Sequence, residues 1–112
     1  MDFELISKIL AKARTKISKG WCQNTSTTTS PKGTVCHCSV YAISKAADEI
    51  MGADMQHTTS YSQTLDFFSK ANKLHGIVSW NDNVGRTKKE VLNAFDTAIN
   101  FAKKGVMPSD DV

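Results

Sequence analysis

Four of the six glycines stand where an apolar pattern with helical spacing stops, and this placement constrains the fold more than any other feature of the sequence. Glycine adopts the left-handed backbone conformation that ends many helices, so it often follows the last helical residue. The four positions are Gly20, Gly52, Gly76 and Gly105. We therefore expect four helices, over about 2–19, 38–51, 60–75 and 88–104, each closed by a glycine.

The clearest helical pattern belongs to residues 88–104. Thr87 and Glu90 precede it with the spacing of a capping box, in which each side chain binds the backbone amide of the other residue. Ser60 and Gln63 have the same spacing at the start of the third predicted helix. Apolar residues then recur on one face of the last helix: Val91, Leu92, Phe95, Ala98, Ile99 and Ala102. The pattern predicts an all-α, compact four-helix domain over residues 1–106, with 107–112 as a flexible tail.

Two segments carry no helical pattern. Residues 22–35 contain almost nothing to bury, and loops of this length are commonly functional lids or disordered segments. We expect a long polar loop there, between the first two helices. Residues 77–80 form a short apolar run that could be a strand, but no second strand is evident to pair with it. We expect extended chain packed against the helices.

The composition excludes several classes of protein. A hydrophobic content of 40% and a charged content of 22% are typical of soluble globular domains. No apolar run approaches the roughly 20 residues that cross a membrane. The N-terminus lacks the basic start of a secretory signal, so we expect a cytoplasmic protein with reduced thiols. The net charge of +3, without a run of basic residues, disfavours nucleic acid and leaves room for a small anionic ligand.

The three cysteines, Cys22, Cys36 and Cys38, suggest two kinds of chemistry. Zinc sites usually show two pairs of closely spaced ligands, and one Cys-x-Cys with His37 or His57 lacks that spacing. We expect no metal and no cofactor. The second option is catalysis, because Cys38 begins a predicted helix and a helix N-terminus favours the thiolate. The chain order of papain-like hydrolases, from oxyanion donor through nucleophile and base to orienting residue, is matched by Gln23, Cys38, His57 or His75, and Asn81.

The run SWNDNVGRTKKEV, residues 79–91, is the most distinctive motif. The capping box accounts for its second half. Arg86, Lys88 and Lys89 surround the start of the last helix, where free backbone amides can hold a phosphate. However, the carboxylate of Glu90 repels an anion at that point, and no glycine-rich cradle is present.

The first half of this motif is expected to lie near the end of the first helix. Trp21 follows that helix and Trp80 precedes the last one, so both indoles lie at helix ends. A buried indole N–H requires an acceptor, which Asn81 or Asp82 can supply. We therefore predict a ligand-binding cluster at one end of the bundle, formed by Trp21, Gln23, Trp80, Asn81, Asp82 and Arg86.

Three stretches together resemble a family of small, uncharacterised bacterial and phage proteins classed as a domain of unknown function. The resemblance spans most of the chain and departs from the family pattern at Tyr41, where the family has glycine. The matching residues are Gly20-Trp21-Cys22-Gln23, residues 38–43 with Ala46 and Ala47, and Trp80-Asn81-Asp82-Asn83-Val84-Gly85-Arg86-Thr87 before Glu90-Val91. The resemblance implies a setting in bacterial or phage regulation or counter-defence, and no particular activity.

The expected function is that of a small non-enzymatic binding module, with a small anionic ligand or a protein as its partner and a homo-oligomer as one possible assembly. Two alternatives stay open. One is a small cysteine-dependent hydrolase or transferase that uses Cys38 with a histidine. The other is a plain protein-interaction domain without a small-molecule site.

Overall fold

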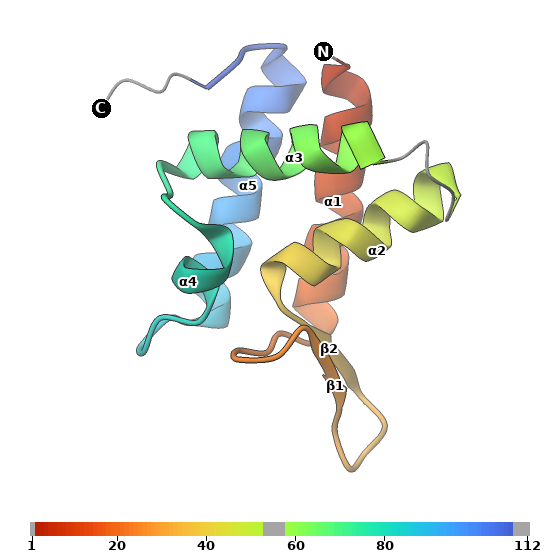
Figure 1. The fold of residues 1–112 in the computed structure, drawn as a ribbon, viewed down its shortest axis with the longest axis vertical. Coiled ribbons are helices and arrows are strands. Elements are labelled where there is room, and N and C mark those ends of the chain that lie inside the picture. The colour runs from red at the N-terminus through yellow and green to blue at the C-terminus, as the bar shows by residue number, and fades with distance from the viewer. Residues whose placement is uncertain (1, 53–57, 109–112) are drawn as a thin grey trace.

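The structure is a computed structural model that describes residues 2–52 and 58–108, and this part is mostly helical (Figure 1). Five helices and one small antiparallel sheet replace the four helices expected for an all-α fold. The elements follow in the order α1 (Phe3–Lys19), β1 (Thr27–Thr29), β2 (Val35–His37), α2 (Ser39–Met51), α3 (Thr58–Asn72), α4 (Ile77–Asn81) and α5 (Lys88–Lys104). His57 and most of the predicted tail, residues 109–112, lie outside the described residues. None of the described helices is long and apolar enough to cross a membrane.

The core lies between α1 and α5, which run antiparallel, and beneath α3, which crosses both of them, and α2, which crosses α1 (Figure 1). Alanines on α2 let that helix approach α1 closely, whereas α3 contributes large aromatic rings. Phe68 of α3 packs on Phe95 of α5 with the ring centroids 4.7 Å apart. The buried side chains of α1, α2 and α5 include Ile6, Ile9, Leu10, Ala13, Ile17, Ala42, Ile43, Ala46, Ala47, Val91, Ala98 and Ile99.

The ends of α3 and α5 test the helix boundaries predicted from the sequence, with one success and one failure. The capping box of α5 is confirmed, because the Thr87 hydroxyl accepts from the Glu90 amide and the Glu90 carboxylate accepts from the Thr87 amide. The capping box predicted at Ser60 is wrong, because α3 already begins at Thr58 and Ser60 lies inside its first turn. The same helix ends at Asn72 instead of residue 75, since Lys73 adopts a left-handed conformation with φ of 56°.

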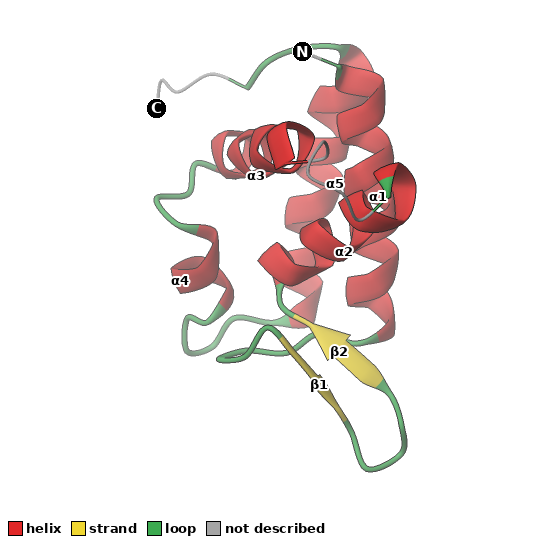
Figure 2. Cartoon of the chain, turned by 45° about the vertical axis from the view of Figure 1, so that its right-hand side comes forward, coloured by secondary structure: helices red, strands yellow, loops and turns green. Residues whose placement is uncertain are grey.

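The expected loop over residues 22–35 forms most of a β-hairpin, residues 27–37, that projects away from the helices (Figure 2). Its register pairs Thr27 with His37 and Thr29 with Val35. Threonine and valine favour extended backbone even when their side chains are exposed. Gly33 permits the turn, because its φ is +84°. The hairpin has little apolar periodicity because most of it faces water, and the sequence pattern therefore missed it.

The segment expected to be extended, residues 77–80, is the start of the short helix α4. Ile77 and Asn81 are its two buried residues. They are four positions apart, so one helix face buries both of them. A strand would have placed them on the same side as exposed Ser79. A buried asparagine is not part of an apolar pattern, and this is why the helix was overlooked.

Candidate functional site

Residues 20–22, which follow α1, cross close to β2. This contact fixes the direction of the chain at Trp21. His37 N donates to Gly20 O at 2.9 Å and Cys22 N donates to His37 O at 3.2 Å, which forms a parallel bridge between Trp21 and His37. A Cβ atom at Gly20 would lie 2.3 Å from Val35 O, so only glycine allows the crossing. Burial, followed by the neighbouring Cys36 thiol, raises the pKa of Cys22 to about 12.

Asn81 connects residues 20–22 to two helices. Its side chain is buried, with 1% of its surface exposed. The Oδ1 atom accepts from Trp21 Nε1 at 2.9 Å, from Ser39 N at 3.0 Å and from Ser39 Oγ at 2.6 Å. The Nδ2 group donates to Cys22 O at 3.1 Å and to Asp82 Oδ1 at 2.9 Å. One asparagine therefore holds together the end of α1, the start of α2 and the end of α4.

Gln23 and Asp82 strengthen this connection. Gln23 Nε2 donates to the carbonyls of Asn81 and Asn83, at 3.0 and 2.9 Å. The backbone amide of Asn24 donates to Asp82 Oδ1 at 2.8 Å. The structure thus brings together four of the six residues predicted as a ligand-binding cluster, and their polar groups mainly bind one another.

The other two predicted residues, Trp80 and Arg86, form a separate stacked pair. The Arg86 Cζ atom lies 4.5 Å from the centre of the Trp80 ring, and Arg86 Nε donates to Trp80 O at 2.9 Å. Arg86 Nη1 also reaches Glu90 Oε2 at 3.3 Å. The backbone hydrogen bond from Thr87, with smaller contributions including the Arg86 charge, lowers the pKa of Glu90. The start of α5 is therefore occupied by its own side chains, at the place where a phosphate would bind.

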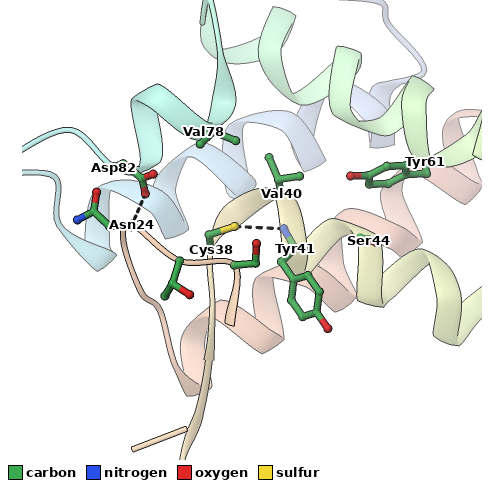
Figure 3. A pocket seen from close by; sticks show the side chains of 10 residues that line it. Asn24, Cys38, Val40, Tyr41, Ser44, Tyr61, Val78 and Asp82 are labelled. Atoms are coloured by element: carbon green, nitrogen blue, oxygen red, sulfur yellow. Dashed lines mark hydrogen bonds between the residues drawn. The ribbon is translucent and has the colours of Figure 1, made fainter. Parts of the chain in front are cut away.

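We call the hydrogen-bonded group of Trp21, Gln23, Asn81 and Asp82 the Asn81 cluster. A cavity of about 580 Å³ opens beside it (Figure 3). Its walls come from the loop after α1, the start of α2, the first half of α3 and α4. Two residues predicted from the sequence, Cys38 and Asp82, contribute to them. The full lining is Asn24, Thr25, Ser26, Cys38, Val40, Tyr41, Ser44, Tyr61, Val78 and Asp82.

Cys38 lies at the floor of this cavity as the N-cap of α2. Its thiol accepts from Tyr41 N at 3.4 Å, and its own amide donates to Ser26 O at 2.9 Å. Tyr61 faces it from α3. Burial, followed by electrostatic interaction with Cys38 and Asp48, raises the pKa of Tyr61. The cysteine was predicted from its place at a helix start, whereas Tyr61 only appeared as one member of an apolar stripe.

The residues of the hydrolase alternative are only partly assembled. Gln23 and Asn81 lie together, but their amide groups are used in the hydrogen bonds above. His75 is exposed and lines a different, smaller hollow beside Trp80. None of the ten residues around the larger cavity is a histidine. Across residues 2–52 and 58–108, no group of three or more histidine, cysteine, aspartate or glutamate side chains is arranged to hold a metal ion.

Comparison with known proteins identifies the family of this chain, but that family has no known function. Residues 1–101 match the sequence profile of DUF6197, a family of unknown function. No curated protein and no solved structure matches the chain. The match extends from the N-terminus through most of α5, so it includes every wall of the cavity and the whole Asn81 cluster. The chain therefore belongs to this family of unknown function, DUF6197.

Proposed function

We propose that this protein is a small, non-enzymatic binding module whose ligand occupies the cavity beside Asn81. The observation that carries the proposal is the cavity itself. Its volume of about 580 Å³ lies within the range of small-molecule sites, which are roughly 300–1,000 Å³. Its walls combine apolar surfaces from Val40 and Val78 with tyrosine and serine hydroxyls and one carboxylate. Ligand sites combine apolar and aromatic surface with polar groups that fix the orientation of the ligand, although this lining is more polar than most.

The hydrogen bonds around Asn81 support this proposal, because they fix the cavity walls before a ligand arrives. Asn81 holds the start of α2 through Ser39, and Asp82 holds the 24–26 loop through the amide of Asn24. A preformed site loses less conformational entropy on binding than a flexible one. In this proposal Trp21, Gln23 and Asn81 act by positioning the walls, and Asp82 is the residue of the predicted cluster that meets the ligand.

The proposal is tested by filling the cavity. Ser44 lines it from α2, and Ser44→Trp should occupy much of the space. Val84→Trp is the matched control, because Val84 is 97% exposed and lies outside the lining. A ¹⁵N-labelled sample is titrated with small aromatic fragments that carry amine, hydroxyl or carboxylate groups. We expect amide shifts at residues 24–26 and at Tyr41, lost in Ser44→Trp and retained in Val84→Trp.

Two results would contradict this function. Fragments that bind equally well to Ser44→Trp would place the site elsewhere on the molecule. Complete absence of fragment binding would favour the plain protein-interaction domain instead. The setting in bacterial or phage regulation or counter-defence, a cytoplasmic location and a homo-oligomeric assembly belong to the same proposal.

One observation favours a second candidate function, because the thiol of Cys38 belongs to the cavity wall and lies at the N-terminus of α2. A helix N-terminus favours a nucleophilic thiolate. A cysteine-dependent transferase or hydrolase would then act on the ligand in the same cavity. The binding function requires that Cys38→Ala keeps fragment binding and that the native thiol reacts with iodoacetamide no faster than an ordinary cysteine.

A further inference from the structure

We propose that the cavity beside Asn81 selects ligands that carry a positively charged amino group next to an apolar body. The proposal rests on the binding function above and names the chemical class of the ligand. It differs from the expectation drawn from the net charge of the chain, which left room for a small anionic ligand. The difference arises because the charges that line the cavity differ from the average charge of the molecule.

The cavity lining is acidic. Asp82 is the one carboxylate among the ten lining residues, and none of them is a lysine, an arginine or a histidine. Asp48 adds negative charge close enough to Tyr61 to help raise the pKa of that phenol, after burial. Three lysines of α1, Lys12, Lys16 and Lys19, line a separate hollow with Glu49 and His37, on the β2 side of α2. A cation entering beside Asp82 therefore meets an attractive field.

Asp82 keeps its negative charge available for such a cation. Both of its recorded hydrogen bonds, from Asn24 N at 2.8 Å and Asn81 Nδ2 at 2.9 Å, reach the same oxygen, Oδ1. These donors are neutral, and the described part of the chain offers Asp82 no ion pair. They orient the carboxylate without cancelling its charge. Oδ2 is thus the acceptor that a ligand ammonium group can use in a charge-assisted hydrogen bond.

The start of α2 has few free hydrogen-bond donors for an anion. The amide of Ser39 already donates to Asn81 Oδ1 at 3.0 Å, and the amide of Tyr41 donates to Cys38 Sγ at 3.4 Å. With the Cys38 amide, which donates to Ser26 O, they are three of the four amides that an anion could use at this helix N-terminus, and only the Val40 amide has no recorded acceptor among the described residues. An anion would have to displace internal hydrogen bonds and would also approach the Asp82 carboxylate. Both effects disfavour it.

The far wall of the cavity suits the rest of a cationic ligand. Figure 3 shows Tyr61 and Asp82 on opposite sides, with the Tyr61 hydroxyl directed inward and Val40 and Val78 between them. The valines provide apolar contact. A compact amine attached to a hydrocarbon or aromatic body fits this order of groups.

The test compares benzylamine, benzyl alcohol and benzoate, which share one ring and differ in the group that Asp82 would meet. Affinities are measured by amide shift titration at pH 7, in the native chain, in Asp82→Asn and in Asp66→Asn. Asp66→Asn is the matched control, because it removes the same charge from an exposed position on α3. The Asp82→Asn change keeps the size of the side chain and an oxygen that can accept from Asn24 and Asn81.

We expect benzylamine to bind about tenfold more tightly than benzyl alcohol, since a charge-assisted hydrogen bond replaces a neutral one. Benzoate should bind most weakly. Asp82→Asn should remove the preference for the amine and leave the alcohol unchanged, whereas Asp66→Asn should leave all three affinities as they are. The preference should also weaken as salt is raised from 20 to about 500 mM, because ions screen the attraction.

The result separates this inference from the binding function. Equal affinities for amine and alcohol, or a preference for amine that survives Asp82→Asn, would overturn the amine specificity. The binding function would still stand in that case if Ser44→Trp abolished binding of both probes. Tighter binding of benzoate in the cavity would overturn the inference in favour of an anionic ligand. Binding of all three probes to Ser44→Trp with unchanged affinity would overturn both proposals.

Discussion

Replacing Asn81 by alanine should destabilise the fold far more than expected for one residue at the end of a five-residue helix. Its Oδ1 atom is the shared acceptor for the amide and the hydroxyl of Ser39 and for the indole of Trp21. Ser39 has no exposed surface, so water cannot replace the lost acceptor without opening the structure. Asn81 itself is equally inaccessible, with 1% of its surface exposed.

The magnitude follows from counting the groups that are left without partners. A buried polar group that loses its only partner costs about 1–3 kcal/mol. The amide of Ser39 carries most of this penalty, because the Ser39 hydroxyl can rotate toward another acceptor. The indole of Trp21 and the carbonyl of Cys22 are only half-buried and regain water in part. The sum is about 3–4 kcal/mol, a large share of the roughly 5–15 kcal/mol that stabilises a domain.

Urea unfolding followed by circular dichroism gives the free energy of unfolding by linear extrapolation. Asn83→Ala is the matched control, because Asn83 is exposed and its recorded hydrogen bonds use its backbone amide and carbonyl, not its side chain. That variant should change the free energy by no more than about 0.5 kcal/mol. A loss of less than about 1 kcal/mol in Asn81→Ala would refute the conclusion that this side chain joins α1, α2 and α4.

Two other features give further predictions, both measured in the same unfolding assay. Gly20→Ala should cost about 1–3 kcal/mol or more, because its Cβ would lie 2.3 Å from Val35 O, whereas Gly76→Ala meets only ordinary contact and should have a small effect. Burial, aided by the charges of nearby lysines, lowers the pKa of His37 below its ordinary value of 6.5 in the folded state. Protonation therefore favours the unfolded state, so stability should fall as pH drops below about 6.5, and His37→Gln should reduce this dependence.

The helices could be predicted from the sequence where their signals are local. The capping box of Thr87 and Glu90 and the apolar stripe behind it require only the next few residues, and α5 follows them closely. The failure at α3 has a related cause. Thr58, Thr59 and Ser60 are all polar, so the pattern offers several starting points and cannot choose among them. The same helix ends before Lys73, which adopts a left-handed conformation. A lysine does not predict that conformation from its residue type.

The hairpin and α4 could not be predicted, because neither follows from an apolar period. The threonines of β1 are exposed, and their pairing with β2 depends on backbone hydrogen bonds that any side chain permits. The helix α4 buries Asn81 at a place where a pattern search requires an apolar residue. What makes that burial favourable is a set of partners from Trp21, Cys22 and Ser39, which lie 42 to 60 positions away.

The predicted site shows a different limit. Residue types and helix ends were sufficient to expect that Trp21, Gln23, Asn81 and Asp82 would meet, and the structure brings them together. The residue types could not show whether the side chains of this cluster bind a ligand or one another. That depends on which hydrogen-bond donors and acceptors are already used within the fold. The geometry uses most of them internally. Among these four described residues, Gln23 Oε1 and Asp82 Oδ2 accept no recorded hydrogen bond, and of these two residues only Asp82 lines the cavity.

The residues that position the cavity walls differ from most of those that would contact a ligand. Ligand specificity should therefore depend mainly on the second group. Trp21, Gln23 and Asn81 hold the scaffold together, so these three residues should tolerate little change whatever the ligand. The atoms that would meet a ligand come mainly from outside the Asn81 cluster, on α2 and α3. Tyr41, Ser44 and Tyr61 form much of the lining, and none of them supplies a recorded side-chain hydrogen bond to the Asn81 cluster. Their substitution can therefore alter the size and polarity of the cavity while the scaffold that frames it stays intact.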